Sequence, residues 1–182
     1  MTMRPEILDD VAAGIRLVPF TLDDADDMGR LADEPGVSEN TYVPSNRDAG
    51  FGLSWASRYV EGWSDGSRAG FTIRSTTDDV FLGFVALVRI EKEERQAEAG
   101  YVLTEAARGR GAATAALRLV SEWAFRVAGM ERLELHIDPT NESSIRVAER
   151  CGYMREGVLR SLYFKEGRRS DTAVYSRLPD DA

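Results

Sequence analysis

The sequence has few of the residues that build disulfides and metal centres. Its 182 residues include one cysteine, Cys151, and one histidine, His136. A single cysteine cannot close an internal disulfide, and one cysteine with one histidine cannot complete a tetrahedral zinc site. We therefore expect no metal centre and a reducing, cytoplasmic setting.

The sequence also lacks long apolar runs and an excess of positive charge. No stretch approaches the roughly 20 apolar residues that a membrane span needs, and residues 1–17 carry acids where a signal peptide has an apolar core. The formal net charge of −8 argues against a face that binds nucleic acid. We expect neither a membrane nor a nucleic-acid partner, although a local cationic site can still hold a small anion.

What is present is the pattern of one mixed α/β domain. Hydrophobic residues make up 43% of the chain and charged residues 30%, which is typical of globular proteins. Alternating apolar residues predict strands at 14–20, 97–103 and 132–138, a pair within 69–91 around the turn "STTDD", and a C-terminal pair within 153–178. Helical spacing predicts helices at 21–34, 48–63, about 111–127 and within 141–153. We expect a single domain at 14–178, a loose lead-in at 1–13 and a C-terminal tail at 179–182.

The stretch "RGRG" at 108–111 joins a predicted strand to a predicted helix. The first turn of a helix presents unpaired N–H groups and a partial positive charge. Gly109 and Gly111 let the backbone approach a ligand, and Arg108 and Arg110 add charge. These features favour an anion site, and the alternative is an ordinary glycine-containing turn with two solvated arginines.

Two familiar anion-binding loops fit these residues poorly. A P-loop requires a lysine after its second glycine, and the lysines of this chain are Lys92 and Lys165. A dinucleotide-binding loop requires G-x-G-x-x-G, and Thr114 occupies the position of the third glycine. The residues therefore leave two alternatives, an anion site of another class and the ordinary glycine-containing turn.

The same residues carry a resemblance to a known family. "RGRGAA" fits the pattern R/Q-x-x-G-x-G/A, with Arg108, Gly111 and Ala113 at the fixed positions. In order and spacing, this loop, "NESSIRVAERCGY" and "EGVLRSLYFKEGRRSDTAVYSRL" resemble the RimJ/RimL branch of the GCN5-related N-acetyltransferases (GNAT) over residues 14–178. The resemblance implies a central, mostly antiparallel sheet splayed between two parallel strands, with acetyl-CoA bound at the splay.

The resemblance also implies which groups contact acetyl-CoA. The pyrophosphate would lie on backbone N–H groups, and the pantetheine arm would pair with the edge of the strand that precedes the loop. Asn141 would hydrogen-bond the pantetheine, and its alternative role, the N-cap of the following helix, is compatible with that. The implied cofactor-binding residues are Tyr101, Val102, Leu103, Arg108, Gly109, Arg110, Gly111, Ala112, Ala113 and Asn141.

Acetyl transfer to an amine needs a base for the ammonium and an acid for the departing thiolate. Many family members place a tyrosine acid where this chain has Ala148, whereas the RimL-like branch has a serine that Ser144 matches. Glu98 stands where the branch often has a glutamate, and it is the implied base. The alternatives are an ordinary polar residue in the first helical turn for Ser144 and a solvated strand residue for Glu98. A further acid of the branch is replaced by Tyr163.

The implied reaction is acetyl transfer to a primary amine by direct attack on the thioester, with the N–H of Val102 or Leu103 stabilising the developing negative charge. The branch suggests the N-terminal α-amine of a protein or peptide, and the acidic net charge favours a cationic acceptor. The alternatives are a small-molecule amine, such as a polyamine or an antibiotic, and a non-catalytic acyl-CoA-binding module. Homodimers are common in the fold, so a homodimer is a candidate assembly.

Three other features fit structural roles. Cys151 ends a predicted helix with no histidine near it in sequence, which favours a small packed residue over a nucleophile. His136 could reach the cleft from its strand, but a packed histidine is the commoner arrangement. Trp55, Tyr59 and Trp63 share one helical face, which predicts core packing, and part of this face could wall the acceptor site.

Overall fold

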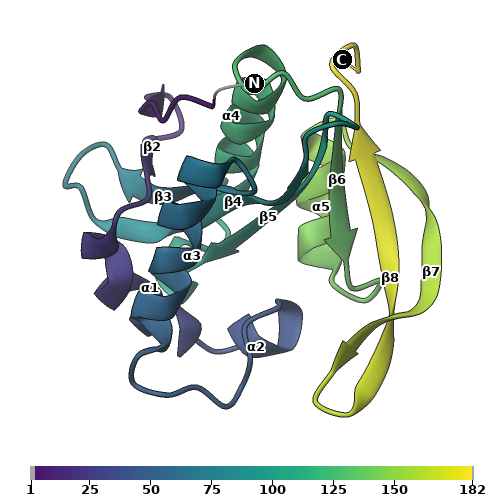
Figure 1. Cartoon of the computed structure of the whole chain (residues 1–182), viewed down its shortest axis with the longest axis horizontal. Helices are drawn as coiled ribbons and strands as arrows, with labels where there is room; N and C mark the ends of the chain where they lie inside the picture. Colours follow the sequence, from purple (N-terminus) through teal and green to yellow (C-terminus); the bar gives the residue numbers. More distant parts are fainter. Residues whose placement is uncertain (1–2, 182) are drawn as a thin grey trace.

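The computed structural model describes residues 3–181 and contains one eight-stranded sheet with the strand order β1-β2-β3-β4-β5-β6-β8-β7 (Figure 1). Neighbouring strands are antiparallel except for β5 and β6, which are parallel. This confirms the expected mixed sheet. The strands are β1 (Leu8–Asp10), β2 (Ile15–Pro19), β3 (Ala69–Ser75), β4 (Phe81–Glu91), β5 (Gln96–Leu103), β6 (Arg132–Ile137), β7 (Met154–Lys165) and β8 (Arg168–Arg177).

Helices cover both faces of the sheet (Figure 1). The helices α1 and α3 pack around Phe84 and Ala86 on one face, and α4 packs against the other face. Within residues 3–181, no helix combines the length and apolarity that crossing a membrane would require. The helices are α1 (Ala25–Ala32), α2 (Val37–Asn40), α3 (Phe51–Asp65), α4 (Ala112–Arg126) and α5 (Glu142–Arg150), with 3₁₀ turns at Leu22–Asp24 and Glu105–Ala107.

The parallel strands β5 and β6 diverge along their length. They pair only over residues 96–98 and 132–134. Beyond Glu98, β5 stays paired with β4 on its other side, while β6 stays paired with β8. The edge of β5 from Ala99 to Leu103 therefore faces a gap in the sheet, and its backbone N–H and C=O groups on that side are open to a ligand.

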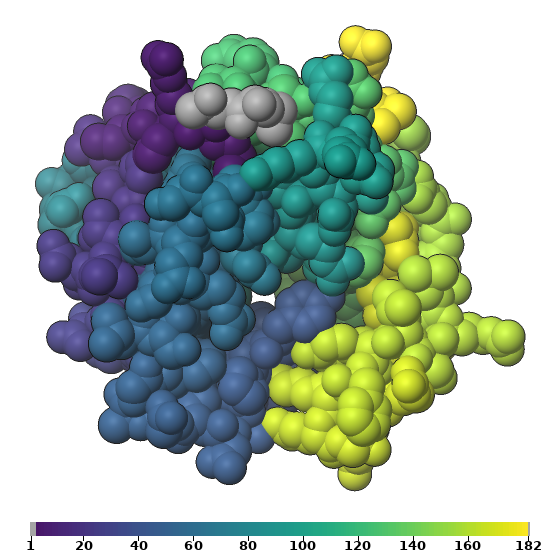
Figure 2. Space-filling view, in the orientation of Figure 1, coloured from purple at the N-terminus to yellow at the C-terminus, as the bar shows by residue number. Residues whose placement is uncertain are grey.

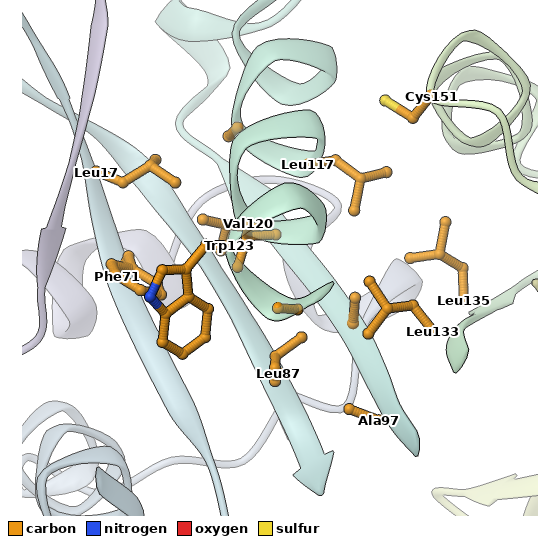
Figure 3. Packing of buried hydrophobic residues seen from close by; sticks show 14 of the residues in the cluster. Leu17, Phe71, Leu87, Ala97, Leu117, Val120, Trp123, Leu133, Leu135 and Cys151 are labelled. Atoms are coloured by element: carbon orange, nitrogen blue, oxygen red, sulfur yellow. The ribbon is translucent and has the colours of Figure 1, made fainter. Parts of the chain in front are cut away.

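The main core lies between the sheet and α4 (Figure 3). Trp123 of α4 lies beside Phe71 of β3, with ring centroids 5.3 Å apart and nearly perpendicular planes. Leu117, Val120 and Ala124 are fully buried. These positions recur at helical spacing, whereas Val127 follows the last residue of α4 and is 38% exposed.

Several element boundaries differ from those that the sequence predicted. The lead-in at 1–13 is not loose throughout, because Leu8–Asp10 form β1 and pair with β2 through a turn at Gly14. A three-residue edge strand is too short to show the alternation of apolar and polar residues by which strands are predicted. The loop at 35–50 contains the short helix α2, and α3 begins at Phe51 rather than at residue 48. Residues 1–2 and 182 lie outside the described residues.

Candidate functional site

A cavity of about 480 Å³ occupies the gap between β5 and β6. Its walls come from α3, the loop at residues 40–44, strands β4, β5 and β6, and the first turn of α5. Figure 2 shows an opening through the centre of the molecule, bordered by the loop near residue 40, α3 and the region of β4 and β5. The cavity, called the cleft below, is therefore lined from both faces of the sheet.

The loop after β5 has the backbone geometry of an anion site. Gly109 and Gly111 have φ of 73° and 85°, in the left-handed region that favours glycine. A Cβ added at either position would meet no atom within 4 Å, so the space beside this backbone is open. The first N–H groups of α4, from Ala112 onward, have no partner within the helix and carry its positive dipole end.

Arg108 does not extend into this open space. Its guanidinium donates to the backbone carbonyls of Leu103 and Pro35, at 3.2 to 3.3 Å. The side chain therefore ties the end of β5 to the segment before α2. Both arginines of the loop are exposed, and Arg108 is held by these backbone carbonyls.

Asn141 caps α5. Its Oδ1 accepts hydrogen bonds from the backbone N–H of Ser144 at 3.1 Å and from the hydroxyl of Ser143 at 2.8 Å. The Nδ2 lies 3.4 Å from Oδ1 of Asn40. The N-cap role is confirmed, and the role in binding pantetheine stays a prediction.

The Ser144 hydroxyl has a partner that the sequence did not indicate. It lies 2.7 Å from the hydroxyl of Tyr101, and both side chains line the cleft. Burial raises the pKa of Tyr101 to about 12, so the phenol stays protonated at neutral pH. Sequence reasoning named Tyr101 only for its backbone, because its contact with Ser144 joins residues 43 positions apart.

Glu98 lies in the cleft and is buried rather than solvated. Its side chain is 6% exposed. Oε1 accepts a hydrogen bond from the Tyr42 hydroxyl at 3.1 Å, whereas Oε2 has no hydrogen-bond partner among residues 3–181. Burial and the adjacent carboxylate both raise the pKa of Tyr42. The expectation of a solvated strand residue is wrong because the loop at residues 40–44 covers Glu98 from 56 positions away in sequence.

His136 stands between two carboxylates. Its Nδ1 lies 3.7 Å from Oε2 of Glu98, and its Nε2 lies 3.2 Å from Oε2 of Glu134. Glu134 and Glu156 are both paired with Arg132, which also lowers the pKa of Glu156 to about 2. Glu98 has one arginine partner, Arg89, whose Nη2 lies 3.5 Å from Oε2, a longer ion pair than those of Arg132 with Glu134 and Glu156. His136 faces the cleft, although packing was the expected role.

The hairpin of β7 and β8 holds the loop that covers Glu98. The ammonium of Lys165 donates to the backbone carbonyls of Ser38, Thr41 and Val43, the last two at 3.0 and 2.5 Å. Tyr163 packs edge-on against Tyr42, with ring centroids 4.8 Å apart. Tyr163 therefore supports the wall of the site in the strand where the branch has an acid.

Cys151 is buried, and its thiol donates to the backbone carbonyl of Thr114 at 3.3 Å. Burial raises the pKa of Cys151 to about 11, so a thiolate is disfavoured at neutral pH. The expectation of a packed residue is confirmed. Trp55 and Tyr59 are buried and also line the cleft, as expected for part of the aromatic face.

Residues 15–154 match the family model for the acetyltransferase (GNAT) domain. The chain is 37% identical over 113 residues to the probable N-acetyltransferase YjcK of Bacillus subtilis (strain 168), which is 61% of this chain and 62% of that relative. It is 33% identical over 85 residues to spermidine N(1)-acetyltransferase of Escherichia coli (strain K12), covering 47% of this chain and 46% of the relative. It is 29% identical over 103 residues to ribosomal-protein-serine acetyltransferase of the same strain, covering 57% and 58%.

The fold is shared with RimJ of Mycobacterium smegmatis, solved in complex with CoA-disulfide. The TM-score is 0.84 at 24% identity, over 97% of this chain and 88% of that chain. Other solved structures of similar fold contain coenzyme A or acetyl-CoA.

Proposed function

Because the chain belongs to the GNAT family of acetyltransferases, we propose that it transfers the acetyl group of acetyl-CoA to the N-terminal α-amine of a protein or peptide. The observation that carries this proposal is the placement of Glu98 and Ser144 in one cleft. Glu98 enters from the face that α3 covers, and Ser144 enters from α5. The gap between β5 and β6 connects the two, as a direct transfer between two bound substrates requires.

Two of the cofactor-binding residues of this proposal, Tyr101 and Val102, line the cleft, whereas Leu103 ends β5 and the others follow β5 or precede α5. The backbone N–H groups of residues 108–113 would hold the pyrophosphate, supported by the positive φ of Gly109 and Gly111. Tyr101, Val102 and Leu103 would offer their open edge to the pantetheine. The Asn141 Nδ2 donates one hydrogen to Oδ1 of Asn40 at 3.4 Å, and its second hydrogen would be donated to the same arm.

Each chemical step then has a group of this chain assigned to it. Glu98 takes the proton of the acceptor ammonium on Oε2, which has no hydrogen-bond partner among the described residues. The N–H of Val102 or Leu103 donates to the carbonyl oxygen as negative charge develops there. Ser144 donates its proton to the departing sulfur, and Tyr101 replaces that proton through its 2.7 Å contact. Solvent takes the second proton that the acceptor nitrogen loses and returns one to Tyr101. No covalent intermediate on the protein is needed.

The charges of the cleft favour an acceptor with one ammonium group. Among the described residues, Glu98 is the single acid that lines the cleft. A polyamine carries several ammonium groups, and each needs a carboxylate or solvent to offset its desolvation. The likeness to spermidine acetyltransferase keeps a small-molecule acceptor as the second candidate. A non-catalytic acyl-CoA-binding module is the third, and it would give no reason for a buried carboxylate beside the gap.

The proposal is tested by thiol release from acetyl-CoA with two acceptor sets. One set contains short peptides with free N-termini, and the other contains small amines, including spermidine and aminoglycosides. We expect release that depends on a peptide. Release with small amines alone would move the function to metabolite or drug modification. Cofactor binding by calorimetry with no release from either set would favour the binding module.

A further inference from the structure

We propose that Arg58, Arg68 and Arg89 form a subsite for a carboxylate on the acceptor, beside the point where its amine is held. All three arginines line the cleft that contains Glu98. This inference rests on the proposed function and specifies the acceptor further, as a peptide with an acidic side chain close to its N-terminus.

The strand register places the arginines in a row next to Glu98. Arg89 of β4 pairs directly with Glu98 of β5. Arg68 precedes β3, whose first residue Ala69 pairs with Leu87 of β4. Extending this antiparallel register by one residue places Arg68 opposite Val88, the neighbour of Arg89. Arg58 reaches the same region from α3, and the charges of Arg58 and Arg68 both act on the phenol of Tyr59.

Two of these arginines have no acidic partner among the described residues, and the third is paired only with Glu98. Neither Arg58 nor Arg68 forms an ion pair with any acid among residues 3–181, and Arg89 has only the 3.5 Å approach to Glu98. By contrast, Arg132 has two carboxylate partners. Arg58 and Arg89 are exposed and Arg68 is half-buried, so their guanidinium groups are accessible to a carboxylate, with which they would form charge-assisted hydrogen bonds.

The spacing suits a peptide better than a free amino acid. Neighbouring strands lie about 4.8 Å apart, so the backbones of β3 and β5 are about 10 Å apart. An extended peptide advances about 3.3–3.6 Å per residue. With its amine at Glu98, the second or third residue of such a peptide would bring a carboxylate to the arginines. Guanidinium groups bind carboxylates in a bidentate manner, which would also fix the direction of the peptide.

The arginines are not placed to serve the diphosphate. The loop at 108–111 follows the C-terminal end of β5 at Leu103, whereas Arg89 pairs with Glu98 near the start of that strand. Five residues of strand separate the two positions, which is about 17 Å at the usual rise per residue. The cleft thus has a cationic region on the acceptor side that the cofactor would leave free.

The experiment compares matched peptides that differ only at the second and third residues, which are both Glu, both Gln or both Lys. We expect kcat/KM to be at least tenfold higher for the Glu peptide than for the Gln peptide, about 1.4 kcal/mol, and lowest for the Lys peptide. Arg68→Gln and Arg58→Gln should each reduce this preference, and Arg68→Glu should reverse it toward the Lys peptide. Arg126→Gln, at an exposed arginine of α4 outside the cleft, is the matched control and should keep the full preference.

Equal rates for the three peptides, or a preference for Lys, would overturn the subsite while leaving the proposed function in place. If no peptide is acetylated, the proposed function fails, and the subsite is then tested with small amines. 6-Aminohexanoate should be acetylated faster than hexylamine, and 1,6-diaminohexane more slowly. If the acetylation rates of these three amines do not follow that order, the subsite is also overturned. Thermal unfolding of each variant shows whether a loss of preference is a loss of fold.

Discussion

The proposed cofactor and acceptor ends of the site would present different kinds of groups to their ligands. At the cofactor end the groups are backbone N–H donors, shaped by Gly109 and Gly111 in the left-handed region. At the acceptor end they are side chains, with Glu98 held by Tyr42 in a buried position. Cofactor binding should therefore weaken when a Cβ is added to either glycine, but it should depend little on the charge of a side chain. The acceptor end should respond to a single change of charge.

The largest expected effect is at the acceptor end. Glu98→Gln keeps the size of the side chain and an oxygen for the Tyr42 hydroxyl, but it removes the proposed base. General bases contribute about 10²–10⁴ in rate, so we expect kcat/KM at neutral pH to fall at least about 100-fold. Affinity for CoA, measured by calorimetry, should be unchanged.

Glu134→Gln is the control for this variant, because Glu134 is already paired with Arg132 and lies beyond His136. It should lose much less activity than Glu98→Gln. Equal losses for the two variants would show that activity depends on the combined negative charge of Glu98 and Glu134, and not on a base at Glu98.

The second effect is at the cofactor end. Gly111→Val places a β-branched side chain at φ 85° and in the open space where the diphosphate would lie. We expect CoA affinity to fall at least tenfold, about 1.4 kcal/mol, as measured by calorimetry. Gly14→Val is a matched control, since Gly14 has φ 70° with equally open space but lies in the β1–β2 turn. It should share the backbone strain and leave CoA affinity intact, and a similar loss of affinity in both would refute the loop assignment.

A third, smaller effect lies between the two ends. Ser144→Ala removes the proposed acid, and Tyr101→Phe removes the hydroxyl behind it. Each should lower kcat by roughly tenfold with little change in CoA affinity, because the contact acts on the departing thiolate.

The double variant of Ser144 and Tyr101 tests whether the two hydroxyls act as one unit. If they do, it should lose little more than either single variant, since coupled groups are not additive. Additive losses would separate Tyr101 from the proton path, and an unchanged kcat in Ser144→Ala would remove Ser144 from the mechanism.

The same contrast explains how much of the site could be predicted from the sequence. The diphosphate loop is contiguous, so Gly109, Gly111 and the start of α4 were predicted from six adjacent residues. The order of most elements followed from local periodicity, whereas the splayed parallel pair was implied by the family resemblance. The burial of Glu98 and the pairing of Tyr101 with Ser144 depend on contacts between distant segments. No local pattern encodes which loop covers a strand, and the net charge of −8 did not reveal the three arginines that line the cleft.

The smallest expected effect concerns the loop that covers the acceptor end. Lys165→Met removes an ammonium that holds the carbonyls of Ser38, Thr41 and Val43, so this loop should become less ordered before the acceptor binds. Ordering a loop at binding costs about 0.5–1.5 kcal/mol per immobilised side chain, so we expect KM for the acceptor to rise roughly threefold at similar kcat. Lys92→Met is the matched control, because its ammonium contacts the carbonyl of Asp65 and lies outside the cleft. A rise in KM for acetyl-CoA instead of the acceptor would place this loop at the cofactor end and contradict the division of the cleft into two ends.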